Sequence, residues 1–390
     1  CSSDHENAIS INPILTHTFI QLTQLKQSIC SWNGNEGMFI KIKEITENKI
    51  NGNISPFALF SMPEILNKNH LNVANAWLEQ SKIEILKKSD FNNRKKITIG
   101  YLSSDFRLHP LYYLIKDVLI NHDREKFTVK LFYSGLQDGS DQLEKLTKII
   151  DAYFNITAIN DEKVIGLMKE EMVNILIDLT GYTQNSRSFL AAQRPAKFHI
   201  NWLGYPGTMG RLDKKPLYDY LLADKYVIPD SEKSNYAEDI MYLSGCYQPN
   251  IANRPSLRDV TKKEYGFEYS ELIFASFGQS LKITKDMFSV CMRLLQKVPN
   301  SILWLLTTKN ACETNLRRFA KDEFQSTEDK IIFAKKVDFD EHIQRLQIID
   351  LFLDTFPYNA HTSASDALWA GCPIISLSGE TFASRVAGSI

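Results

Sequence analysis

The first ninety or so residues carry their hydrophobic side chains at helical spacing. Between residues 13 and 30 the apolar positions recur every three or four residues, which is the pattern of an amphipathic helix. Similar spacing predicts helices at residues 38–50 and 63–87, with Asn-rich stretches as solvated connectors. We therefore expect residues 1–92 to form a helical segment.

From residue 96 the pattern changes to short β-rich runs that alternate with helical ones. It predicts strands at 97–102, 127–133 and 174–179, and helices at 110–120, 141–151 and 161–171. This alternation is typical of a parallel sheet with helical crossovers. Ligands on such sheets bind beyond the carboxyl ends of the strands, so we expect the loops at 103–110 and 178–187 to face a ligand.

A second alternation begins at residue 272. It predicts strands at 273–277, 301–306, 330–334, 348–353 and 373–377, and helices at 285–295, 311–319, 340–346 and 363–370. A loop-rich stretch at 201–258 separates the two blocks. The α/β pattern therefore predicts two Rossmann-like, doubly wound domains facing a cleft, one at 93–258 and one at 259–390, after the helical segment.

Composition excludes several classes of protein. The 390 residues hold 45 Lys and Arg against 46 Asp and Glu, so the basic excess of a nucleic-acid-binding protein is missing. The apolar runs are far shorter than the roughly 20 residues that cross a bilayer. Six scattered cysteines and no signal-peptide pattern predict an intracellular, cytoplasmic protein without a zinc module. Because the chain opens on Cys1, we expect it to be a piece of a longer protein.

A phosphate site is predicted where the helix at 363–370 begins. Thr362 and Ser363 lie at that start, where free backbone N–H groups and the helix dipole attract anions. Asp366 lies four residues beyond Thr362, on the same helical face, and could accept hydrogen bonds from a sugar or ribose hydroxyl. The alternative is that Thr362 and Ser363 only cap the helix.

Three further cationic or polar groups belong to the same block. Lys282 follows a strand and could meet a diphosphate, while His342 and Arg345 share a face of a short helix. Alternatively, Lys282 is a solvated surface cation and the other two lie on a solvated helix face. Together these groups could hold a nucleotide diphosphate without metal. No Gly-x-x-x-x-Gly-Lys loop and no Gly-x-Gly-x-x-Gly after a strand is present, which disfavours ATPases and dinucleotide enzymes.

The first block supplies a candidate base. His109 follows a strand-end loop, and its neutral imidazole could act as a general base or hold an acceptor hydroxyl. Asp178, at the end of a buried strand, is a second candidate. The alternatives are a structural histidine and an aspartate that caps the next turn.

Five long runs, taken in order, carry a family resemblance. They lie at residues 100–110, 193–208, 298–306, 354–371 and 379–385. They resemble the catalytic region of the O-linked N-acetylglucosamine transferases, glycosyltransferase family 41, which includes the plant Spindly-type proteins. The resemblance covers residues 96–390 and extends to Cys30-Ser31-Trp32, which is similar to the end of the family's tetratricopeptide array.

The resemblance implies a GT-B fold whose second domain holds the nucleotide sugar. It implies an inverting enzyme that moves N-acetylglucosamine from UDP-GlcNAc to Ser or Thr of intracellular proteins, with no metal or other cofactor. His109 falls where the family has a histidine proposed to assist the acceptor. The positions that fall where the family binds UDP are Gln279, Lys282, His342, Arg345, His361, Thr362, Ser363 and Asp366.

The chain departs from the family pattern at three places. Ser363 replaces the last Thr of a His-Thr-Thr run, and Tyr113 stands where animal members have a second histidine. Family members also continue beyond the equivalent of residue 390, so we expect the second domain to be truncated at its C-terminus. Two alternatives stay open: O-fucosylation from GDP-fucose, and a non-catalytic module that binds a nucleotide sugar or a protein. The His109-Pro110 pair favours N-acetylglucosamine transfer over fucosylation.

Overall fold

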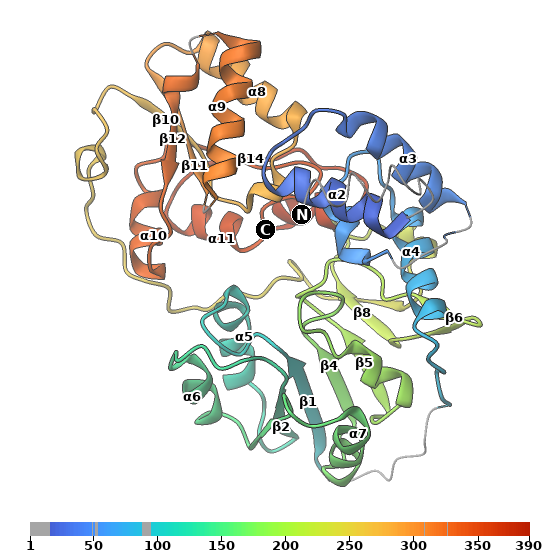
Figure 1. Cartoon of the computed structure of the whole chain (residues 1–390). Helices are drawn as coiled ribbons and strands as arrows, with labels where there is room; N and C mark the ends of the chain where they lie inside the picture. The colour runs from blue at the N-terminus through green and yellow to red at the C-terminus, as the bar shows by residue number, and fades with distance from the viewer. Residues whose placement is uncertain (1–15, 49, 51–53, 88–94, 308, 326) are drawn as a thin grey trace.

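The N-terminal segment is helical, as predicted, but the helix predicted at 63–87 is too long, since it begins at Asn67 and ends at Gln80. The computed structural model describes residues 16–48, 50, 54–87, 95–307, 309–325 and 327–390 (Figure 1). The segment contains α2 (Thr16–Ser28), α3 (Asn35–Glu47), the 3-10 helix η1 (Pro56–Ser61) and α4 (Asn67–Gln80). Ile20, Ile42 and Leu59 lie buried at its centre. The predicted helix start at residue 13 and the connector near residue 92 lie outside the described residues.

The first sheet has seven parallel strands in the order β3-β2-β1-β4-β5-β8-β9. Its strands are β1 (Ile97–Ser103), β2 (Phe127–Tyr133), β3 (Ala152–Asn155), β4 (Ile175–Asp178), β5 (Phe198–Asn201), β8 (Tyr220–Ala223) and β9 (Asp239–Tyr242). The crossover helices are α5 (Pro110–Ile120), α6 (Gln142–Thr147) and α7 (Asp161–Glu170). Because the strands run parallel, β1 and β4 both end at the edge from which the loops at 103–110 and 178–187 emerge.

The predicted loop-rich stretch at 201–258 is wrong in part, because it contains two strands of this sheet. β8 and β9 have four residues each, and a short hairpin of β6 (Arg211–Leu212) and β7 (Lys215–Pro216) lies before them. The predicted helix at 141–151 is also too long, since α6 ends at Thr147 and β3 begins at Ala152. Strands β3, β8 and β9 have only four residues each, which gives an alternating pattern little length in which to appear.

The second sheet has five parallel strands in the order β12-β11-β10-β13-β14. They are β10 (Leu272–Ser276), β11 (Ser301–Leu306), β12 (Ile331–Ala334), β13 (Leu351–Leu353) and β14 (Ile374–Ile375). The helices are α8 (Lys285–Lys297), α9 (Asn310–Phe324), α10 (Phe339–Leu346) and α11 (Thr362–Trp369), with a 3-10 turn η5 (Ser280–Lys282) after β10. Each predicted element of this block is present, with ends shifted by a few residues.

The last residues of the chain return to the first sheet. They form η7 (Phe382–Ser384) and α12 (Val386–Ser389), and Phe382 and Val386 are buried in the core of the first sheet. The Phe382 ring meets the Tyr247 ring edge-on at 4.9 Å between centroids. The chain therefore crosses between the two lobes twice, once through the segment that follows β9 and once before η7.

The two lobes touch beside the predicted site. In Figure 1, α5 lies on the side of the first lobe that faces α10 and α11 of the second. Tyr113 of α5 stacks on Phe339, the first residue of α10, with ring centroids 4.1 Å apart. In the described ranges, no helix is long and apolar enough to span a membrane.

Candidate active site

The loop between β13 and α11 is held closed by a carboxylate that sequence reasoning missed. Asp354 follows β13 directly, and its Oδ1 accepts hydrogen bonds from the backbone N–H groups of Thr355 (2.7 Å) and Ala360 (2.6 Å). Its Oδ2 accepts from Ser376 Oγ at 2.5 Å. Burial raises the pKa of Asp354 to about 6, although these hydrogen bonds and Lys282 oppose the rise. Asp354 thus fixes the course of the loop that leads into α11.

Lys282, the last residue of η5, is directed onto this same loop. Its Nζ donates a hydrogen bond to the Asn359 carbonyl at 2.7 Å and lies 3.7 Å from the centroid of the Tyr358 ring. Burial lowers the pKa of Lys282 to about 8, while the Asp354 charge raises it in part. The interpretation of Lys282 as a solvated surface cation is wrong, because the ammonium group is held against the loop by a carbonyl and an aromatic face.

His361 lies at the N-cap of α11, next to Tyr358. The two ring centroids are 5.3 Å apart. Burial, and secondarily the Lys282 charge, lower the pKa of His361 well below its ordinary value, although an interaction with the Ala383 backbone opposes the drop. Its Nε2 is buried and has no hydrogen-bond partner among the described residues. An unpaired buried nitrogen is costly, so it marks a position where a bound group can supply the missing hydrogen bond.

Thr362 and Ser363 form the first turn of α11, as predicted, and both are half-buried. The N–H groups of a first helical turn have no acceptors within the helix. These donors and the unpaired His361 nitrogen therefore lie at the same end of α11. Gln279, in contrast, is exposed at the N-cap of η5. Contact of Gln279, Thr362 and Ser363 with a ligand stays a prediction.

His342 and Arg345 are packed into the lobe, so the interpretation of a solvated helix face is wrong. Arg345 donates a hydrogen bond from Nε to His342 Nδ1 at 3.3 Å, and its guanidinium carbon lies 4.5 Å from the Phe277 ring centroid. Burial lowers the pKa of His342 to about 3 and that of Arg345 to about 10. His342 is therefore neutral at pH 7 and carries its proton on Nε2, which lies 3.7 Å from Asp366 Oδ2.

Asp366 has a partner that sequence reasoning did not find. Arg254, from the segment between the two lobes, donates a hydrogen bond from Nη1 to Asp366 Oδ1 at 2.6 Å. A second nitrogen of Arg254 donates to Asn250 Oδ1, also at 2.6 Å. Burial raises the pKa of Asp366 to about 6, and Arg254 opposes that rise. Oδ1 is thus engaged within the protein, and contact of Oδ2 with a hydroxyl group of a ligand stays a prediction.

On the first lobe, His109 caps α5. Its Nδ1 accepts a hydrogen bond from the Leu111 N–H at 3.3 Å. Burial lowers the pKa of His109, while Asp105 raises it and Arg107 lowers it further. The neutral ring therefore carries its proton on Nε2, from which it can donate a hydrogen bond, and its role toward an acceptor stays a prediction.

A cavity of about 490 Å³ lies beside the His109 loop. Its walls include Arg107 and Tyr133, and also Asp138 and Ser140, to which the Leu108 N–H donates hydrogen bonds at 3.0 and 3.1 Å. The loop that carries His109 thus borders open space at the carboxyl end of the first sheet.

Asp178 is not available as a base. Its Oδ1 accepts from the Thr180 and Gly181 N–H groups at 2.8 and 3.1 Å. Its Oδ2 accepts from Ser188 Oγ and Tyr218 Oη, each at 2.6 Å. The side chain is completely buried, so the interpretation that it caps the turn after β4 is confirmed.

A family model and several relatives match this chain. The model described as Glycosyl transferase family 41 matches residues 29–249 and 252–390. A probable UDP-N-acetylglucosamine–peptide N-acetylglucosaminyltransferase, SEC of Arabidopsis thaliana, is 30% identical over 93% of this chain and 39% of its own length. The SPINDLY protein of the same plant, with the same printed activity, is 29% identical over 76% of this chain and 32% of its own length. The chain therefore spans less than half of these relatives.

Among solved structures, a mutant O-GlcNAc transferase of Thermobaculum terrenum superposes with a TM-score of 0.80. The match covers 100% of this chain and 74% of that one, at 20% sequence identity. At that identity the likeness establishes the fold, two Rossmann-like lobes of GT-B type, which confirms the predicted fold class.

Proposed function

Because this chain belongs to glycosyltransferase family 41, we propose that it is the catalytic region of an enzyme that moves N-acetylglucosamine from UDP-GlcNAc to Ser or Thr hydroxyls of proteins. One observation carries the proposal: the Lys282 cation, the unpaired His361 nitrogen and the first turn of α11 are gathered around one loop. That is a set of hydrogen-bond donors and positive charge suited to a diphosphate.

The donor diphosphate is assigned to the start of α11. When the bond from the sugar to UDP breaks, negative charge develops on the leaving phosphate. Lys282 and the N–H groups of Thr362 and Ser363 are preorganised to stabilise that charge, and removal of one such donor costs about 3 to 4 kcal/mol of transition-state stabilisation in comparable sites. These groups supply the positive charge from the protein itself, so we propose that transfer needs no metal ion.

Of the remaining predicted residues, Asp366 and Gln279 are assigned to contacts with the donor, and His342 and Arg345 to holding Asp366 in place. Asp366 Oδ2 accepts a hydrogen bond from a hydroxyl group, since Oδ1 is occupied by Arg254. His342 and Arg345 fix the position of the carboxylate from the side of α10. Gln279, exposed beside Lys282, is assigned to the donor as well.

His109 is assigned to the acceptor. Because its Nδ1 accepts the Leu111 N–H, its Nε2–H can donate a hydrogen bond to the oxygen of a serine or threonine hydroxyl and orient it for attack. The hydroxyl proton becomes acidic as the new C–O bond forms, so orientation rather than strong basicity is the contribution we propose. We also propose that the enzyme is intracellular. The described residues include five free cysteines, most of them buried, which suits a reducing compartment.

Calorimetric titration with UDP and with GDP, each with and without EDTA, tests the proposal. We expect UDP to bind more tightly than GDP and EDTA to leave its affinity unchanged. Preferential binding of GDP would move the donor to GDP-fucose, and loss of UDP binding in EDTA would contradict metal-free transfer. Binding of neither nucleotide would overturn the proposed donor site.

A further inference from the structure

Two cysteines from opposite ends of the sequence meet in the described structure. Cys30, just after α2, and Cys312, in the first turn of α9, are 282 positions apart, and their Sγ atoms lie 3.3 Å apart. Both side chains are buried. We propose that Cys30 and Cys312 form a redox-active thiol pair that a peroxide converts to a disulfide, joining the helical segment covalently to the second lobe.

Two hydrogen bonds fix the chain to the second lobe directly before Cys30. Ser280 Oγ donates a hydrogen bond to the Ser28 carbonyl at 2.7 Å, and Asn315 Nδ2 donates to the Ile29 carbonyl at 2.8 Å. A disulfide bond is about 2.05 Å long, so the two sulfurs need to approach by only about 1.2 Å.

Aromatic packing holds the same contact from the other side. The Trp32 ring lies 5.6 Å from the Phe288 ring of α8 and 5.0 Å from the Phe319 ring of α9. These contacts anchor the chain two residues beyond Cys30. The sulfurs therefore belong to a formed interface between the helical segment and the second lobe, and their closeness does not depend on one flexible loop.

The surroundings divide the two thiols into a nucleophile and its partner. The hydrogen bond between the two sulfurs lowers the pKa of Cys312, although burial opposes this, and the same hydrogen bond and burial raise the pKa of Cys30. Cys312 lies in the first turn of α9, where the helix dipole favours a negative charge. This position points to Cys312 as the sulfur that reacts first and to Cys30 as the thiol that resolves it.

The chemistry needs hydrogen peroxide as the oxidant. The Cys312 thiolate attacks one peroxide oxygen and breaks the O–O bond, which gives a sulfenic acid and hydroxide. The Cys30 sulfur then attacks the sulfenic sulfur, the S–O bond breaks, and the oxygen leaves as water with the Cys30 proton. In sum, two thiols and one peroxide give one disulfide and two waters.

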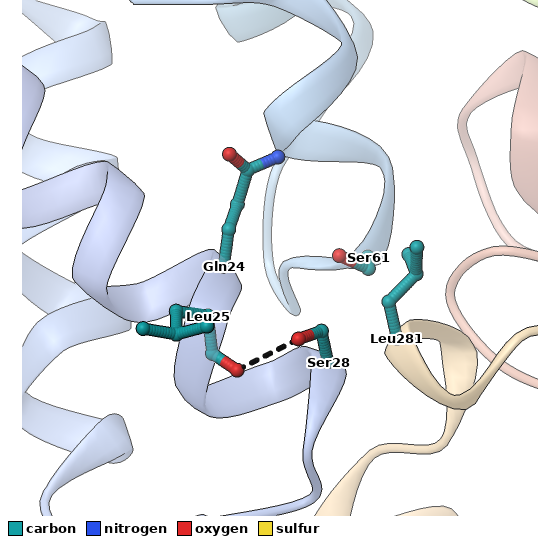
Figure 2. A pocket seen from close by; sticks show the side chains of 5 residues that line it. All are labelled: Gln24, Leu25, Ser28, Ser61 and Leu281. Carbon is teal, nitrogen blue, oxygen red and sulfur yellow. Dashed lines mark hydrogen bonds between the residues drawn. The ribbon is translucent and has the colours of Figure 1, made fainter. Parts of the chain in front are cut away.

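The pair lies next to the turn that carries Lys282. Cys30 Sγ is 3.7 Å from the Ser280 carbonyl, and Ser280 is the first residue of η5. A cavity of about 280 Å³ lies nearby, between α2 and η5. It is lined by Gln24, Leu25 and Ser28 of α2, by Ser61 and by Leu281 of η5 (Figure 2). The proposed disulfide does not depend on the proposed function, because the test for it uses no nucleotide.

Peptide mapping of the intact 390-residue chain tests the pair. The folded protein is treated with hydrogen peroxide, its remaining thiols are blocked with N-ethylmaleimide, and it is digested without reductant for mass spectrometry. We expect a peptide that links Cys30 to Cys312, reversed by dithiothreitol and absent from Cys30→Ser and Cys312→Ser. Cys291→Ser is the matched control, since Cys291 is buried with its pKa raised by burial, and it should retain the link.

A trapping experiment identifies the nucleophile. In Cys30→Ser, dimedone should tag Cys312, and in Cys312→Ser it should leave Cys30 at least about tenfold less modified. Oxidation of other cysteines while Cys30 and Cys312 stay reduced would overturn the proposal. Formation of the link only after unfolding in urea would overturn it as well, because the folded arrangement would then play no part.

Discussion

Arg254 Nη1 lies 2.6 Å from Asp366 Oδ1, and both side chains are buried. The arginine comes from the segment between the lobes and the aspartate from α11, so one ion pair ties that segment to the second lobe at the predicted site. The charge on Asp366 is costly in this setting, since its pKa is raised to about 6 despite the arginine. The pair therefore both positions Asp366 and keeps it ionised.

Arg254→Met should lower the free energy of unfolding by about 3 kcal/mol, because it leaves the Asp366 carboxylate buried without its partner. Adding Asp366→Asn should restore most of that loss, since no unpaired charge then remains. Urea unfolding of the two single variants and the double variant gives the coupling energy. Additive losses in the double variant would show that the two side chains do not act as a pair.

The catalytic efficiency of the enzyme should depend on pH through the charge of Lys282. With its pKa lowered to about 8, the side chain is a cation below that pH and becomes neutral above it. We therefore expect kcat/KM, which reports the free enzyme, to fall about tenfold per pH unit above pH 8. Lys282→Arg should move this fall to higher pH because a guanidinium stays charged.

Lys282→Ala should abolish transfer while the unfolding curve changes little. The loss follows from the missing cation at the leaving phosphate. Turnover by this variant near that of the unchanged chain would remove Lys282 from the catalytic role.

Two substitutions separate the capping role of His109 from its proposed contact with the acceptor. Asn is a favourable N-cap residue, so His109→Asn should keep stability within about 0.5 kcal/mol, whereas His109→Ala should lose about 1 kcal/mol. Both should lower turnover by about 100-fold, since each removes the Nε2 donor. UDP affinity should stay unchanged in both, and a selective loss of UDP binding would instead assign His109 to the donor.

The stacking of the Tyr113 ring on Phe339 should stabilise the junction between the lobes. Tyr113→Ala should lower the free energy of unfolding by about 1 to 2 kcal/mol, from lost apolar burial and lost aromatic stacking. Tyr113→Phe keeps the ring and should cost about 0.5 kcal/mol. Equal losses in the two variants, measured by urea unfolding, would show that the stack is not the important contact.

Elements with strong local signals were predicted closely. Helix α5 begins at Pro110, where proline is favoured in a first turn, and strand β2 coincides with its predicted range. In contrast, β8 and β9 are four residues long and carry no readable period. Their strand conformation depends on the pairing of β8 with β5 and of β9 with β8, which are tertiary contacts that local pattern cannot supply.

At the candidate site, local pattern placed Lys282 after a strand and Thr362 and Ser363 at the start of a helix, and the structure has them there. Their role toward a ligand stays a prediction. Arg254 was missed because its partner lies 112 positions away, and only the fold brings the two together. The spacing of His342 and Arg345 showed that they share a face of α10, but spacing cannot tell whether that face is buried. Asp354 was missed because its role is to close a loop through backbone hydrogen bonds.

The return of the last residues to the first sheet limits how the lobes can move. Arg385 Nε donates to the Tyr226 carbonyl and Ser389 Oγ to Asp224 Oδ2, each at 2.5 Å, so this segment moves with the first lobe. The second lobe is then joined to the first by two crossings of the chain and also by the helical segment, whose α2 contacts η5 and whose α4 contacts β6. Because these attachments lie at different places, we expect the lobes to open and close over a small range only.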